Sequence, residues 1–138
     1  PLVDDLTVDG AHVLWIGLPT WDNPPDGQRD LATLQSVYAD VAADDDRVDF
    51  LDTRTILDRP PGTFTEVLPD PEGGVSLTVR NPDGLHICPD GVRLVVSDAL
   101  SWITERWPVP VSGTWEDEQW FFGPTGEPRQ NFVGCPTP

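Results

Sequence analysis

Apolar and polar residues follow two different patterns in the first half of the chain. Residues 11–18 form an almost continuous apolar run, which is typical of a strand buried on both faces of a parallel sheet. Residues 31–43 repeat apolar side chains at steps of three and four. This spacing predicts a helix that packs on the sheet through Leu31, Leu34, Val37, Tyr38 and Val41. Residues 48–52 predict a second strand, so the three elements together make a βαβ unit.

The pattern changes in the second half. Prolines and glycines interrupt residues 59–81, where two short alternating segments, 63–68 and 75–79, suit a small hairpin or an extended loop. Helical spacing returns after Pro89, with apolar side chains at Val92, Val95, Val96, Ala99 and Ile103. We therefore predict a second helix that packs against the sheet.

The two ends of the chain show no periodicity. Residues 1–10 are acidic and predict an irregular connection. From Trp107 onward the chain is rich in proline, glycine and aromatic residues. We therefore expect one α/β domain over residues 1–107, followed by a tail over residues 108–138 that packs back on it.

The charge of the chain excludes several kinds of partner. It carries 24 acidic residues against 8 basic ones, all arginine, for a net charge of −16. Such a surface repels phosphate backbones and anionic lipids, so we expect no nucleic-acid binding and no adsorption to membrane surfaces. No apolar run approaches the length of about 18 residues that indicates a membrane span. The acidic run at 44–46 lacks the spaced ligands of a calcium loop, so we expect no metal site.

The chemistry of the sequence centres on Asp83 and His86, a carboxylate three residues before an imidazole. An aspartate can hold one ring nitrogen of a histidine so that the other nitrogen takes and returns a proton. Asn81-Pro82 favours a turn, Gly84 allows a tight bend, and Pro89 suits the first turn of a helix. The sequence therefore predicts a shaped loop that presents both side chains at the entry to a helix.

This loop resembles the last conserved block of the SGNH, or GDSL-type, hydrolases. The resemblance rests on Asp-Gly-Leu-His at residues 83–86, with Arg80 before it and with Pro89 and Gly91 after it. It extends upstream over the predicted βαβ unit, so most of the chain is similar to the C-terminal half of such a domain. The resemblance implies a flavodoxin-like three-layer parallel sheet, of which this chain holds only the C-terminal part.

The same resemblance implies a function. It makes Asp83 and His86 two members of a Ser-His-Asp triad in an esterase or acyl hydrolase that needs no metal or organic cofactor. The family's Gly-Asp-Ser block and its oxyanion glycine and asparagine are missing here, and the chain begins at Pro1. No serine has a Gly-Asp-Ser setting among Ser36, Ser76, Ser97, Ser101 and Ser112. We therefore expect the nucleophile on an N-terminal segment or a companion chain, unless the module has lost its activity.

Three further residues are candidates for substrate binding. Trp21 and Asn23 lie in the loop that follows the first predicted strand, and ligands of open α/β sheets bind beyond the carboxyl ends of the strands. Trp21 could instead cover the backbone of its own loop. Arg80 could face a carboxylate or an acyl oxygen of the substrate, or it could form a structural salt bridge.

The two cysteines suggest a disulfide. Cys88 lies just before Pro89, where a serine or threonine would cap the helix, and Cys135 lies in the tail. A bridge would tie the tail beside the Asp83 loop, and the chain-entropy model gives its closure about 4 kcal/mol. Two free thiols are the alternative. The bridge implies an oxidising compartment, so we expect an extracellular or cell-envelope protein.

The expected substrate is a small-molecule or glycan ester, namely an O-acylated carbohydrate or a lipid ester, acted on by a hydrolase or an O-acyl transferase. The alternative is a catalytically inactive module of the same fold that binds glycan or a protein partner, with aromatic residues of the tail as one means. A third possibility is a fragment whose exposed strand edges pair between copies.

Overall fold

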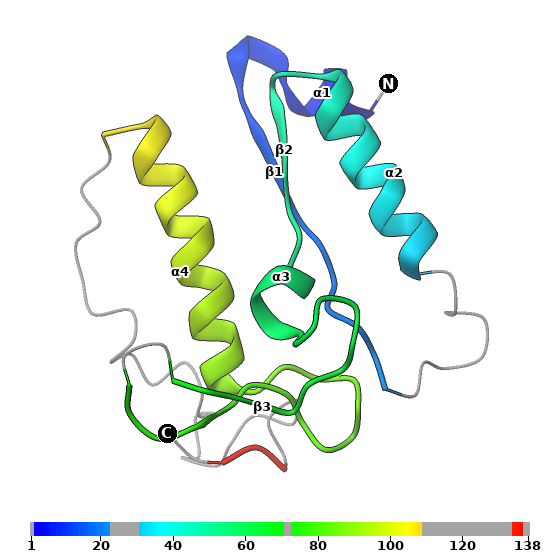
Figure 1. The fold of residues 1–138 in the computed structure, drawn as a ribbon. Coiled ribbons are helices and arrows are strands. Elements are labelled where there is room, and N and C mark those ends of the chain that lie inside the picture. Colours follow the sequence, from blue (N-terminus) through cyan, green and yellow to red (C-terminus); the bar gives the residue numbers. More distant parts are fainter. Residues whose placement is uncertain (1, 23–30, 71–72, 109–133, 137–138) are drawn as a thin grey trace, which may run out of the picture.

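The computed structural model describes residues 2–22, 31–70, 73–108 and 134–136 (Figure 1). Its elements, in chain order, are α1 (Leu2–Leu6), the 3-10 helix η1 (Val8–Gly10), β1 (Val13–Ile16), α2 (Leu31–Asp44), β2 (Val48–Leu51), α3 (Arg54–Leu57), β3 (Val67–Leu68), β4 (Leu77–Thr78) and α4 (Pro89–Arg106). No helix in these ranges has the length and apolar character needed to cross a membrane.

The predicted βαβ unit is present. β1 and β2 are parallel and in register from Val13 opposite Val48 to Ile16 opposite Leu51. α2 connects them, and Figure 1 shows α2 and α4 on opposite sides of this strand pair. Within the described residues the parallel sheet has two strands, so the wider flavodoxin-like sheet stays a prediction. The boundary between domain and tail also stays a prediction, because residues 109–133 lie outside the described part.

The packing face of α2 differs from the predicted one. Leu34 and Val37 are exposed, with 40% and 48% of their surface open to solvent, whereas Gln35 is buried. Neighbouring residues of a helix are about 100° apart, so the face that holds Gln35 and Tyr38 turns the other two side chains away from the sheet. Tyr38 packs edge-on against Trp15, with ring centroids 4.8 Å apart, as a core position requires.

Residues 2–10 also differ from expectation. They form the short helix α1 and the 3-10 turn instead of an irregular connection. Thr7 closes α1, because both its backbone N–H and its hydroxyl donate to the carbonyl of Val3, at 2.9 and 2.8 Å. A threonine that bonds back to the preceding turn in this way is a local feature that hydrophobic periodicity does not reveal.

The hydrophobic core lies between α3, the β3–β4 hairpin and α4. Its buried members are Ile56, Leu57, Leu68, Val79 and Val95. Gly91 lets the first turn of α4 approach this core, because a Cβ atom there would lie 2.3 Å from the carbonyl oxygen of Val79. The same carbonyl accepts a hydrogen bond of 2.9 Å from the N–H of Cys88. The start of α4 is therefore fixed on the core.

The segment between α3 and α4 forms a small hairpin, which is one of the two forms expected from the sequence. β3 and β4 are antiparallel, with Val67 opposite Thr78 and Leu68 opposite Leu77. The chain then runs from β4 through Arg80, which forms an isolated antiparallel bridge with Ile87. The residues between these two positions are the loop that carries Asp83 and His86, so the hairpin and α4 together hold both ends of that loop.

We expect Leu57→Ala to lower the free energy of unfolding by about 2–5 kcal/mol, because Leu57 is fully buried in the core beneath the loop and the truncation leaves a cavity. Urea unfolding followed by circular dichroism measures this. Val75→Ala is the control, since Val75 is 83% exposed and its truncation removes no packing. Equal stabilities of the two variants would contradict this core assignment.

Candidate active site

The loop between β4 and α4 is closed by its own backbone. The N–H of Asn81 donates to the carbonyl of His86 at 2.9 Å, and the N–H of Gly84 donates to the carbonyl of Asn81 at 3.0 Å. Gly84 has a φ of 77°, the left-handed conformation that glycine adopts without strain. The turn predicted from Asn81-Pro82 and Gly84 is therefore present, and it brings Asp83 back toward His86.

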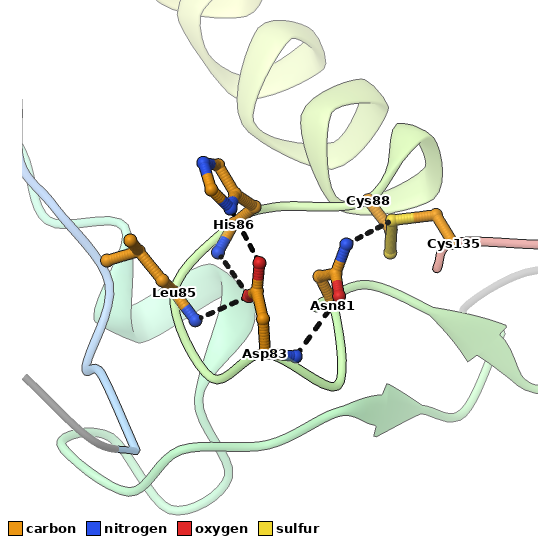
Figure 2. Close-up of a disulfide and its surroundings, with 6 residues drawn as sticks. All are labelled: Asn81, Asp83, Leu85, His86, Cys88 and Cys135. Atoms are coloured by element: carbon orange, nitrogen blue, oxygen red, sulfur yellow. Dashed lines mark hydrogen bonds and ion pairs between the residues drawn. A yellow bond between two sulfur atoms is a disulfide. The ribbon is translucent and has the colours of Figure 1, made fainter. Parts of the chain in front are cut away.

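Asp83 uses both carboxylate oxygens inside this loop (Figure 2). Oδ1 accepts hydrogen bonds from the backbone N–H groups of Leu85 and His86, at 2.8 and 3.0 Å. Oδ2 lies 2.6 Å from Nδ1 of the His86 ring. An ionised carboxylate only accepts, so Nδ1 carries the proton and Nε2 is left as the basic nitrogen. Figure 2 shows Nε2 pointing away from Asp83.

The electrostatics of the loop keep Asp83 ionised. Partial desolvation raises the pKa of Asp83, but the hydrogen bonds from the His86 ring and from the N–H groups of His86 and Leu85 together outweigh it and lower this pKa to about 2. The side chains of Asp83 and His86 are 42% and 44% exposed. The pair is therefore a charged acceptor and an imidazole that is open to solvent, which is an arrangement suited to proton transfer with a bound molecule.

The end of the tail supports this loop. Cys88 and Cys135 form the disulfide that the sequence suggested. Asn81 joins the bridge to the loop, since its Oδ1 accepts from the N–H of Asp83 at 3.1 Å and its Nδ2 donates to Sγ of Cys135 at 3.6 Å. Cys88 occupies the N-cap position of α4 without making a side-chain cap hydrogen bond, because its sulfur is in the bridge.

Arg80 points into the protein. Its side chain is fully buried, and its Nη1 lies 3.8 Å from Oδ1 of Asp58. Burial lowers the pKa of Arg80, although the carboxylates of Asp58 and Asp83 act in the opposite direction. The salt bridge considered as an alternative in the sequence analysis is therefore present. Contact between Arg80 and a substrate stays a prediction.

The loop after β1 lies beside the Asp83 loop. The N–H of Asp22 donates to the carbonyl of Gly84 at 3.1 Å, which brings the half-buried Trp21 next to the same loop. This juxtaposition fits the expectation that Trp21 lies on the substrate side, while a direct substrate contact is still a prediction. Asn23, the other predicted binding residue of this loop, lies outside the described residues.

Two residues of the site gave no signal in the sequence. Asp58 is fully buried, and its Oδ2 accepts hydrogen bonds from the hydroxyl of Thr20 at 2.6 Å, from the N–H of Thr20 at 3.3 Å and from the N–H of Gly62 at 3.2 Å. Sequence reasoning missed both Asp58 and Thr20, because an aspartate and a threonine in Pro- and Gly-rich segments look like ordinary turn residues.

No serine hydroxyl bonds to His86 within the described part of the chain. Ser36 donates to the carbonyl of Thr33 in α2, and Ser97 and Ser101 lie in the middle of α4. Ser112 lies outside the described residues. In the same described ranges, no three His, Cys, Asp or Glu side chains come together in a way that could hold a metal ion.

The described structure combines a βαβ unit with an Asp-His pair on the loop before a helix. The model of the family described as "Protein of unknown function (DUF459)" matches residues 1–102. This match covers most of the 138 residues, so the chain belongs to that family. No curated protein and no solved structure matches the chain significantly.

We expect Asp83 to titrate with a midpoint near pH 2, well below the ordinary value of 3.8. Because its pKa is lowered in the folded state, Asp83 adds stability above the ordinary pKa, and this stability is lost as the pH falls through about 2. The gain is small, since the side chain is 42% exposed and screened by water. Carbon NMR of the Asp83 carboxyl group between pH 6 and pH 1.5 measures the midpoint. A value near 4 would show that the loop hydrogen bonds are not formed in solution.

We expect the double variant Cys88→Ala/Cys135→Ala to lose up to about 4 kcal/mol of unfolding free energy, because the bridge closes a loop of 47 residues. Urea unfolding of the variant and of the oxidised wild type measures the difference. Wild-type protein treated with reductant is the control and should match the variant. If all three samples unfold at the same urea concentration, the bridge does not form in the native protein.

Proposed function

We propose that this chain supplies the Asp-His part of a Ser-His-Asp triad in an SGNH-type hydrolase domain with a flavodoxin-like parallel sheet. The observation that carries the proposal is the distance of 2.6 Å between Oδ2 of Asp83 and Nδ1 of His86, on a loop whose backbone fixes the carboxylate. The position of this loop, beside the loop that follows β1, also fits the rule that ligands of open α/β sheets bind beyond the carboxyl ends of the strands.

The proposed reaction is acyl transfer from an ester. Nε2 of His86 takes the proton of a serine hydroxyl as its oxygen attacks the acyl carbonyl, and then gives that proton to the departing alcohol. Asp83 holds the ring in the Nδ1–H form and stabilises the imidazolium while it exists. His86 then takes a proton from water, in a hydrolase, or from a sugar hydroxyl, in an O-acyl transferase, as that oxygen attacks the acyl carbonyl. The bond between the acyl group and the serine oxygen breaks, and His86 gives the proton to the departing serine oxygen.

The proposal assigns the nucleophilic serine to polypeptide outside these 138 residues, on an N-terminal segment or a companion chain. Three observations support this assignment. The sequence has no Gly-Asp-Ser block, and no described serine bonds to His86. The His86 ring is 44% exposed, so its Nε2 is open to a group that arrives from another segment. The chemistry requires no metal and no organic cofactor.

The proposed substrate is an O-acylated carbohydrate or a lipid ester outside the cell. The Cys88–Cys135 disulfide supports an oxidising compartment, since such bridges persist mainly in secreted and cell-surface proteins. The net charge of −16 disfavours polyanionic substrates such as nucleic acids. Uncharged acyl sugars and neutral lipid esters suit this surface better.

The second candidate function is an inactive module of the same fold that binds glycan or a protein partner. The observation in its favour is that, in the described part of the chain, His86 has no serine partner. An Asp-His pair without a nucleophile can keep its geometry and do no chemistry, because the loop hydrogen bonds that form it are structural as well.

The test is labelling of the native protein with a fluorophosphonate, which reacts with activated serines, together with intact mass measurement and N-terminal sequencing. We expect the label on a serine outside these 138 residues. His86→Ala should slow labelling by about a hundredfold or more, because the general base is removed. His12→Ala is the matched control, since His12 is the other histidine, is exposed and packs edge-on against Trp107, with ring centroids 5.5 Å apart.

Two outcomes would contradict the esterase. One is a native molecule that takes up no probe, and the other is labelling that His86→Ala leaves unchanged. The first would favour the inactive module, and binding to acylated and deacylated glycans would then be measured. The second would place the reactive serine in a site that does not use His86.

A further inference from the structure

We propose that Asp58 and Arg80 form a buried positioning pair that holds the His86 loop against the Trp21 loop and so sets the direction of the His86 ring. This inference deepens the proposed function and rests on it for its catalytic meaning. The geometry it describes is independent of any reaction. Both side chains are completely buried, whereas the members of the other ion pairs described in the chain are at least partly open to solvent.

The guanidinium of Arg80 joins the two loops directly. Nη1 donates to the carbonyl of Thr20 at 2.8 Å, and Nη2 donates to the carbonyl of Leu85 at 3.3 Å. Its Cζ lies 4.9 Å from the centroid of the Phe64 ring, which covers it. The rigid fork of a guanidinium can reach two carbonyls at once in a fixed geometry, and a lysine ammonium cannot reproduce that.

Asp58 holds Thr20 from the other side. Its Oδ2 accepts from both the hydroxyl and the N–H of Thr20, at 2.6 and 3.3 Å, while the carbonyl of Thr20 accepts from Arg80. Thr20, the residue before Trp21, is therefore held at its N–H, its hydroxyl and its carbonyl by Asp58 and Arg80 together. This arrangement fixes the loop after β1 relative to the loop that carries His86.

The contact with Leu85 bears directly on His86. The carbonyl of Leu85 and the N–H of His86 belong to the same planar peptide group. Arg80 binds the carbonyl edge of this group, and Oδ1 of Asp83 accepts from its N–H edge at 3.0 Å. With both edges held, the plane cannot rotate freely. The next peptide group is held as well, because the carbonyl of His86 accepts from the N–H of Asn81 at 2.9 Å. The backbone on both sides of the His86 Cα fixes the direction of the Cα–Cβ bond, and the contact of Nδ1 with Oδ2 of Asp83 at 2.6 Å then fixes the ring.

The geometry of Asp58 and Arg80 suits the positioning of the two loops better than it suits attraction between the two charges. Nη1 of Arg80 and Oδ1 of Asp58 are 3.8 Å apart, and neither that oxygen nor Nε of Arg80 makes a hydrogen bond in the structure. A buried ion pair generally adds little stability over apolar side chains of similar size. The hydrogen bonds of both side chains go to the backbone and to the Thr20 hydroxyl, so positioning of the loops accounts for the pair better than stability does.

The experiment compares Arg80→Lys with wild type by long-range proton–nitrogen NMR of the His86 ring in alkaline buffer, where imidazole rings are neutral. In wild type we expect the Nδ1–H form to dominate. Arg80→Lys should shift the ring toward the Nε2–H form, because one edge of the peptide group is released. Arg47→Lys is the matched control: Arg47 pairs with Asp45 at 2.5 Å, is 37% exposed and does not contact the loop, so it should leave the His86 signals unchanged.

In the catalytically complete protein, Arg80→Lys should lower kcat about a hundredfold with little change in KM, since misplacement of a reacting group by about 1 Å slows a reaction by that factor.

If Arg80→Lys does not fold, Thr20→Val tests the inference instead, because it removes only the hydroxyl that bonds to Asp58 and should shift the same tautomer signals. A folded variant, with unchanged circular dichroism, that keeps the wild-type His86 signals would overturn the inference. A shifted ring in a protein that no fluorophosphonate labels would support the positioning pair and refute the esterase.

Discussion

The candidate site depends on one planar unit, the peptide group between Leu85 and His86. Its N–H donates to Asp83 at the surface, and its carbonyl accepts from Arg80 in the interior. Nη1 of Arg80 in turn lies 3.8 Å from Oδ1 of Asp58, a residue of another segment. Asp83 is held within its own loop, where its backbone N–H donates to Oδ1 of Asn81. The orientation of a half-exposed ring is therefore determined by contacts that begin in the core.

The strand, helix and strand of the first half could be predicted because each leaves a local pattern of apolar residues in the sequence. The inward face of α2 could not, since Gln35 occupies a buried position that polarity alone assigns to the surface. Its Nε2 donates to the carbonyl of Leu18, two residues after β1, and this contact satisfies the nitrogen of the buried amide. A hydrophobic pattern predicts which apolar side chains can be buried. It does not reveal a polar side chain that is buried because another segment supplies its hydrogen-bond partner.

The residues of the site divide in the same way, into those whose contacts are local and predictable and those whose contacts are long-range and not predictable. Asp83 and His86 are three residues apart, so their pairing is local and the sequence alone indicates it. The contacts of Thr20 with Asp58 and with Arg80 span 38 and 60 residues, and no local pattern encodes them. Cys88 and Cys135 were a special case, because two cysteines allow only one intramolecular pairing. Long-range polar contacts become visible only after the strands have placed the loops side by side.

The disulfide has a consequence for the covalent structure of the molecule. Because it joins residues 88 and 135, the backbone between them and the sulfur bridge form a closed covalent ring. A single peptide-bond cleavage inside this ring opens the backbone but releases nothing, since both new ends remain attached through the bridge. A molecule cut in this way differs from the intact one by the mass of one water, and it separates into two polypeptides only under reduction. Processing within the ring would thus leave the oxidised protein in one covalent piece.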